Sequence, residues 1–121
     1  MDKTQKQQEI HCTFSQKIQE LQRQQDDVQN KQRQLSEAQD EFCDFRTELQ
    51  ILIENIKISY GEAHANWLYE YEQELSDEYR KIEAKYVNER EALEQERKRL
   101  YQLEDKYYKE KEQQLILLDK E

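Results

Sequence analysis

The sequence predicts an all-α protein, an elongated antiparallel two-helix hairpin of the coiled-coil type. Three observations predict this fold: apolar residues recur every seven positions, proline is absent, and a single glycine lies near the middle of the chain. Helix formers such as Gln, Glu, Lys and Leu dominate the composition, and they carry small helix penalties. With 39% charged and 35% hydrophobic residues, the 121-residue chain has too little apolar material for a conventional globular core.

The first helix is predicted over residues 8–58. Counting by sevens gives an unbroken apolar series, which is a strong coiled-coil signal: Phe14, Leu21, Val28, Leu35, Phe42, Leu49 and Ile56. The companion series of the seam lies four residues before each of these positions: Ile10, Lys17, Gln24, Lys31, Ala38, Phe45 and Leu52. This second series is polar between residues 17 and 31 and apolar near residue 50. We therefore expect a soft half near the N-terminus, where the helices pack weakly, and a firm half near the turn, where they pack strongly.

The reversal is predicted near residues 58–64, around the only glycine. Gly61 can end the first helix as a left-handed residue. Ser59 and Glu62 also form a Ser-x-x-Glu capping box, a competing interpretation in which the second helix begins at once. Both interpretations make residues 1–121 a single helical-hairpin domain.

The second helix is predicted over residues 63–118, with a weaker heptad series of its own. Folding the chain at the glycine places the two series in antiparallel register, with Phe42 opposite Tyr79. In the same register Leu49 meets Glu72, the least favourable layer of the seam, where the carboxylate has to reach towards solvent.

Catalytic, cofactor and metal sites are not expected. A two-helix hairpin has no room to enclose a site with convergent polar groups, and a chain with one glycine has no glycine-rich phosphate loop. His11 and His64 lie far apart, with no Cys/His cluster of zinc spacing. His11 beside Cys12 could bind a soft metal, but a solvated helix face is the favoured interpretation. We expect a protein that is not an enzyme and has no cofactor.

The net charge of −9 disfavours nucleic acid and anionic membrane surfaces as partners, because both would repel the chain. No apolar run approaches the roughly 20 residues of a membrane span, and the N-terminus lacks the apolar region of a secretory signal. Cys12 and Cys43 are expected to be free thiols of a reducing compartment. We therefore expect a cytoplasmic protein, with export alongside a client as the open alternative.

The chain has more apolar residues near the turn and the C-terminus than a two-helix seam needs. Ile53, Trp67 and Tyr71 surround the turn end, and the apolar residues 115–118, including Leu117, have no apolar partner in the predicted register. Such a surplus predicts a surface for a helical partner or a second copy of the chain. The alternative is that the aromatic residues only close the end of the hairpin and that the C-terminal leucines belong to a frayed helix end.

Two segments carry a resemblance to a known family: SYGEAHANWLYEYEQE at 59–74 and NEREALEQERKRLYQLEDKYYKE at 88–110. The chain resembles the small helical-hairpin proteins of Gram-positive bacteria that accompany LXG-type toxins to the type VII secretion system, a group distantly WXG-like in shape. Gly61 matches the turn glycine of that family, whereas Ser59 stands where the family has the tryptophan of its Trp-x-Gly turn, and Trp67 follows six residues after the glycine. Tyr108 and Glu112 form a Tyr-x-x-x-Glu spacing similar to secretion signals of related systems.

The resemblance implies a helical adaptor or chaperone. Such a protein binds the helical N-terminal domain of a secreted toxin, often with a second small helical protein, and helps to target the toxin to the secretion system. Two other functions remain open: a structural coiled coil that self-associates, for example as a homodimer, and an escort or stalk hairpin of another export apparatus.

Overall fold

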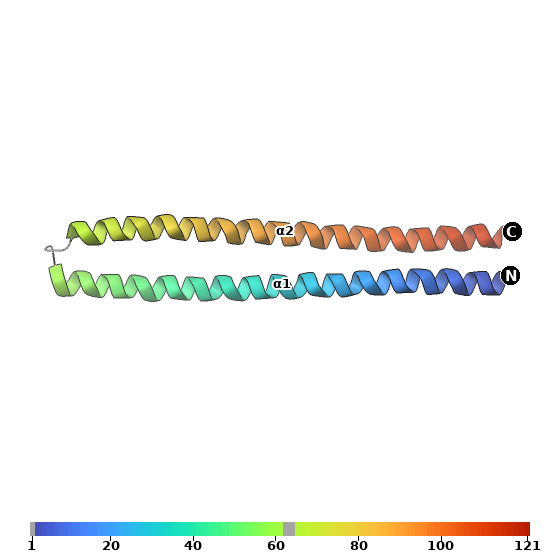
Figure 1. Cartoon of the computed structure of the whole chain (residues 1–121), viewed down its shortest axis with the longest axis horizontal. Helices are drawn as coiled ribbons and strands as arrows, with labels where there is room; N and C mark the ends of the chain where they lie inside the picture. Colours follow the sequence, from blue (N-terminus) through green and yellow to red (C-terminus); the bar gives the residue numbers. More distant parts are fainter. Residues whose placement is uncertain (1, 62–64) are drawn as a thin grey trace. The chain divides into compact units, whose positions relative to one another are not determined.

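The computed structural model describes residues 2–61 and 65–121. Two helices, α1 (Lys3–Tyr60) and α2 (Ala65–Asp119), form a helical hairpin, and the described residues contain no strand. This confirms the predicted all-α fold (Figure 1). The chain divides into two compact units, each built from both helices. We call Met1–Lys31 with Ala92–Glu121 the terminal unit, and Gln32–Glu91 the turn unit.

Helix α1 begins five residues earlier than the predicted start at residue 8, because Asp2 caps it. The backbone N–H of Gln5 donates a hydrogen bond of 2.8 Å to Oδ1 of Asp2. A side-chain oxygen at this position satisfies one of the free N–H groups of the first turn. The same end of the chain lies beside the end of α2, since Lys3 Nζ donates to the carbonyl oxygen of Asp119 at 3.2 Å.

The end of α1 has the glycine conformation that the sequence predicts. Helix α1 extends to Tyr60, and Gly61 follows with a φ of 58°, in the left-handed region that favours glycine. Ser59 lies in the last turn of α1, exposed to solvent. Its proposed capping partner, Glu62, lies outside the described residues.

The heptad series that starts at Phe14 forms the contact between the helices. Phe14, Leu21 and Val28 are buried in the terminal unit. In the turn unit Phe42 meets Tyr79 edge-to-face, with ring centroids 5.6 Å apart and an interplanar angle of 75°. This layer is the one that the antiparallel register predicts.

The companion series of the seam lies one residue later than predicted at Ile18, Gln32, Arg46 and Ile53, whereas the predicted members Ile10, Gln24 and Ala38 are half-buried. Ile18 and Ile53 are buried, and the positions between them at the same spacing are half-buried: Gln25, Gln32, Gln39 and Arg46. By contrast, Phe45 and Leu52, which the sequence placed in the seam, are each 54% exposed. The prediction was wrong because four long polar side chains occupy the true series. Their stems cover apolar surface while their polar ends reach partners or solvent.

The expected order of firm and soft halves is also wrong. Of the eight described hydrophobic residues that are buried, the turn unit contributes two, Ile53 and Leu68, and the terminal unit contributes the rest: Phe14, Ile18, Leu21, Val28, Leu100 and Leu118. Lys17 does not disrupt this core. Its ammonium group lies over the rings of Phe14 and Tyr107, at 5.1 and 5.4 Å from their centroids, in favourable cation–π geometry.

Candidate functional site

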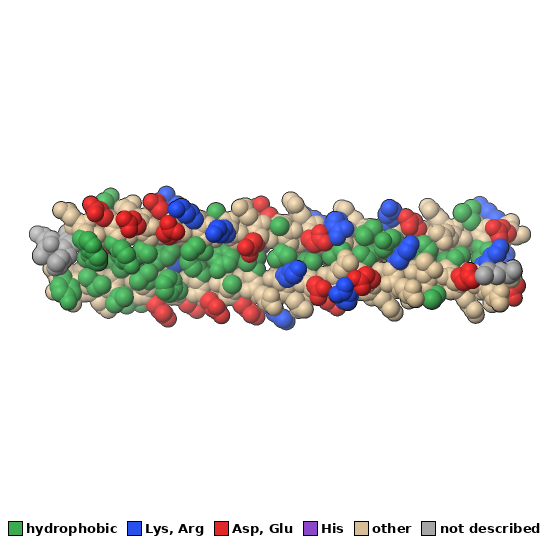
Figure 2. Space-filling view, viewed as in Figure 1, with side chains coloured by type: hydrophobic (Ala, Val, Ile, Leu, Met, Phe, Trp, Pro, Cys, Tyr) green, Lys and Arg blue, Asp and Glu red, His purple; other side chains and the backbone are tan. Residues whose placement is uncertain are grey.

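The turn unit exposes an unusual number of large hydrophobic side chains. On the face seen in Figure 2, hydrophobic side chains gather over both helices towards the turn. The exposed set in this unit is Phe45, Ile51, Leu52, Ile58, Tyr60, Trp67, Tyr69, Tyr71 and Val87. Single exposed apolar residues are ordinary on proteins, whereas large contiguous apolar patches are typical of interaction surfaces.

Two ion pairs between the helices define one face of the turn unit. Arg46 pairs with Glu83, and Lys57 Nζ lies 2.6 Å from Oε1 of Glu72. The hydrogen bond to Glu72 raises the pKa of Lys57 above its ordinary value, and the charges of Glu54 and Glu72 add to the shift. This pair also shows how the seam accommodates Glu72 in the layer with Leu49, because a lysine of the opposite helix binds the carboxylate. We call this side the ion-paired face.

The opposite face of the turn unit carries aromatic and aliphatic side chains. At about 100° per residue, Phe45 and Leu52 project from α1 on the side of the seam away from the ion pairs, seven residues apart. Trp67 and Tyr71 do the same on α2, four residues apart. Since the ion pairs join one side of each helix, these four residues share the other side, which we call the aromatic face. Trp67 and Tyr71 stack, with ring centroids 5.6 Å apart and planes 1° from parallel.

Acidic side chains border the aromatic face. On α1, Glu41 and Glu48 lie three or four residues from Phe45, and on α2 Glu74 lies three residues after Tyr71, so each carboxylate neighbours an exposed ring. All three carboxylate residues are exposed. Figure 2 shows acidic side chains along both borders of the hydrophobic area, joined on the border along α2 by basic side chains. Residues 32–91 contain 15 Asp and Glu against seven Lys and Arg, so they carry eight of the nine net negative charges.

Three of the four predicted partner-binding residues lie on the surface. Trp67 is 61% exposed, Tyr71 38% and Leu117 61%. Ile53 was predicted wrongly: it is 3% exposed and belongs to the seam, because the companion series lies one residue later than the sequence suggested. The neighbouring Leu52 takes its place on the aromatic face. Leu52 and Phe45 were not predicted to lie on this surface, because their apolar character placed them in the predicted seam.

The structure brings Trp67 and Tyr71 together, whereas Leu117 belongs to the terminal unit. Tyr108 and Glu112 also belong to that unit. They lie four residues apart on α2, and both are exposed.

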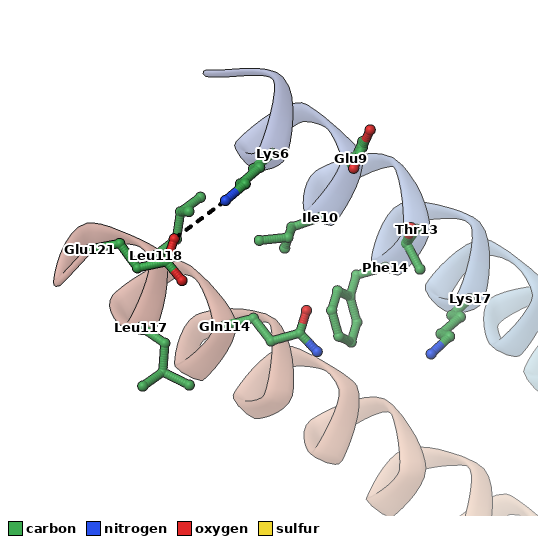
Figure 3. Close-up of a pocket in the computed structure, with 10 residues that line it drawn as sticks. All are labelled: Lys6, Glu9, Ile10, Thr13, Phe14, Lys17, Gln114, Leu117, Leu118 and Glu121. Atoms are coloured by element: carbon green, nitrogen blue, oxygen red, sulfur yellow. Dashed lines mark hydrogen bonds and ion pairs between the residues drawn. The ribbon is translucent and has the colours of Figure 1, made fainter. Parts of the chain in front are cut away.

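The terminal unit has an open groove of about 440 Å³ between the ends of α1 and α2. Figure 3 shows Ile10 and Phe14 of α1 pointing towards α2, while Leu117 points away from α1. Leu118 lines the groove and is buried, so the prediction that residues 115–118 have no apolar partner is wrong for this residue. An ion pair between Lys6 and Glu121, 3.5 Å long, lies at the groove.

The part of the chain that the structure describes contains no group of three or more His, Cys, Asp and Glu residues that could hold a metal ion. Within the same residues, neither helix has a stretch long and apolar enough to cross a membrane.

The arrangement of the aromatic face is suited to packing against another helix, because its rings are exposed and already ordered. Comparison of the chain with protein-family models, with curated proteins and with solved structures found no match.

Proposed function

We propose that this protein is a helical adaptor or chaperone whose aromatic face packs against the helices of a partner protein. The observation that carries the proposal is that Trp67 and Tyr71 are exposed and stacked outside the seam of the hairpin. Burial of apolar surface stabilises a complex by a free energy of about 25 cal/mol per Å² removed from water. Trp and Tyr are also the residues most often found as energetic anchors of protein interfaces.

The resemblance to companions of LXG-type toxins supports a specific client. We propose that the partner is the helical N-terminal domain of a secreted toxin, and that the adaptor helps to target this toxin to a type VII secretion system. A helical client suits the aromatic face, since an amphipathic helix presents apolar anchors at spacings of three and four residues. The exposed pair of Tyr108 and Glu112 would then be available to the secretion machinery in the bound state.

Co-expression with the LXG domain of a toxin encoded beside this protein tests the proposal. We expect the wild-type chain to co-purify with that domain and the double variant Trp67→Ser, Tyr71→Ser to lose at least 30-fold in affinity, since one anchor often contributes 2 kcal/mol or more. The matched control is Tyr101→Ser, Tyr108→Ser, which removes two exposed tyrosines of the terminal unit. This control should bind like the wild type. Equal binding by both double variants would refute the aromatic face as the client site.

A second function, self-association as a structural coiled coil, draws on the same exposed surface. It predicts a particle of twice the chain mass or more in the absence of any client. Light scattering coupled to gel filtration measures this mass directly. The adaptor proposal expects a monomer of 15.0 kDa at micromolar concentration.

A further inference from the structure

We infer that the segment of the partner that packs on the aromatic face is a basic amphipathic helix, with Lys or Arg flanking its apolar stripe. The inference rests on the proposed function and adds the charge of the partner to it. Its basis is the combination of exposed rings and acidic borders on one face of the turn unit.

Three carboxylates beside the aromatic face, those of Glu41, Glu48 and Glu74, lack cationic partners within the described residues. On the ion-paired face Glu72 and Glu83 are bound by Lys57 and Arg46 across the seam. Beside the aromatic face, by contrast, no ion pair joins Glu41, Glu48 or Glu74 to another residue of the described ranges 2–61 and 65–121.

The spacing of these carboxylates suits a helix laid along the face. Glu41 and Glu48 are seven residues apart on α1, which corresponds to about 10.5 Å along the helix axis at 1.5 Å per residue. Two basic residues seven apart on a partner helix have the same separation, so both could pair while the apolar residues between them contact Phe45 and Leu52. On the other side Glu74 of α2 supplies a further carboxylate, and Lys81, seven residues later on the same side, is already paired with Glu78.

The same charges disfavour a second copy of the chain as the occupant. The turn unit carries a net charge of −8 from its sequence, so two aromatic faces brought together would align like charges at their borders. The terminal unit carries a net charge of only −1, so the acidity is concentrated where the apolar surface is exposed. Charge complementarity therefore selects a basic partner over a copy of this chain.

Two designed peptides of 24 residues test the inference with the full chain. Both carry the same Leu, Ile and Phe stripe on a helix, and they differ only at the flanking positions, which are Lys and Arg in one peptide and Glu in the other. Trp67 is the single tryptophan of the chain, so its fluorescence reports binding at the aromatic face if the peptides lack tryptophan. We expect the basic peptide to bind at least tenfold more tightly than the acidic peptide at 50 mM salt. This preference should shrink as salt screens the border charges.

Charge-neutral variants assign the preference to the acidic borders. The triple variant Glu41→Gln, Glu48→Gln, Glu74→Gln should lose most of the tenfold preference while it keeps its helicity. The matched control removes three exposed carboxylates of the terminal unit, Asp26→Asn, Asp105→Asn, Glu112→Gln, and should keep the preference.

The outcomes separate the inference from the proposed function. Equal binding of the two peptides, lost in Trp67→Ser, would overturn the basic partner and leave the aromatic face as a binding site. Binding of neither peptide, together with failure to bind the toxin domain, would overturn both. A chain that forms a dimer through this face, with salt strengthening the dimer, would show that the occupant is a second copy and would overturn the inference.

Discussion

Trp67 stacks on Tyr71 one helical turn away, with ring centroids 5.6 Å apart and planes 1° from parallel, on a surface where both rings face solvent. Each ring restricts the other before any partner arrives. Ordering a side chain at an interface costs about 0.5–1.5 kcal/mol, so a stacked pair has already lost part of the freedom that binding would remove. The arrangement is therefore a preordered anchor that the hairpin itself does not need for its seam.

Substitution of Trp67 should leave the stability of the isolated protein nearly unchanged. We expect Trp67→Ser to alter the free energy of unfolding by no more than about 0.5–1 kcal/mol, as for surface positions in general. The adjacent Leu68 is 2% exposed, so Leu68→Ala should cost about 2–5 kcal/mol. Urea denaturation followed by circular dichroism measures both. If Trp67→Ser destabilises as much as Leu68→Ala, the aromatic residues close the protein's own core.

A second pair of neighbours tests the position of the companion series. Ile53 is 3% exposed and Leu52 is 54% exposed. We expect Ile53→Ala to lower the free energy of unfolding by about 2–4 kcal/mol, because it removes buried methyl groups and leaves a cavity. Leu52→Ala should change it by less than about 1 kcal/mol. The reverse order in denaturant midpoints would restore the series that the sequence suggested.

The fold could be predicted from the sequence because its signals are local and repeated. Seven apolar residues from Phe14 to Ile56 at one spacing specify a helix with one buried stripe. The only glycine specifies where that helix ends, and the structure gives Gly61 the expected positive φ. These features do not depend on how each helix is oriented about its own axis relative to the other helix.

The surface was harder to predict because it depends on that orientation. A seam needs two series, and one residue of difference decides whether Phe45 and Leu52 or Arg46 and Ile53 face the other helix. Hydrophobicity favours the first choice, whereas the cation of Arg46 lies 4.6 Å from the ring centroid of Tyr79 and also pairs with Glu83. Counting apolar residues does not register such contacts, so half of the aromatic face was assigned to the core.

The ion pair of Lys57 and Glu72 makes a prediction about titration. The hydrogen bond to Glu72 is the largest cause of the raised pKa of Lys57, and Glu54 contributes less. We therefore expect Glu72→Gln to lower the pKa of Lys57 more than Glu54→Gln does, in an NMR titration of the lysine side chain. Equal shifts in the two variants would show that the contact across the seam is not maintained in solution.

The same pair gives a sign for the dependence of stability on pH. A lysine whose pKa is higher in the folded than in the unfolded state makes its full contribution to stability at pH values below its pKa in the unfolded state, about 10.4. That contribution is lost as the pH rises through the higher folded value. The melting temperatures of the wild type and of Lys57→Gln should therefore converge at pH values above the folded-state pKa of Lys57. A difference that persists unchanged to the highest pH would point to lost packing of the lysine stem instead.

The distribution of burial predicts which amides are protected longest. In the terminal unit Leu21, Val28 and Leu100 form a buried cluster against which Leu93, Leu103 and Tyr107 pack. Local opening is easiest where few buried apolar contacts oppose it. We expect the backbone amides of this cluster to exchange hydrogen more slowly than amides of the turn unit, for example those near Ile51 or Leu75. Hydrogen exchange measured by NMR or mass spectrometry resolves the two sets.

A variant in the terminal unit shows whether that protection comes from the cluster. Leu100 is fully buried, so Leu100→Ala should cost about 2–5 kcal/mol and speed exchange most strongly around Leu21 and Val28. Leu117→Ala, at an exposed leucine of the same unit, is the control and should leave exchange unchanged. Slower exchange in the turn unit of the wild type would mean that the aromatic face is covered in solution, because exposed rings cannot supply that protection. A mass measurement on the same sample would then identify self-association as the cause or exclude it.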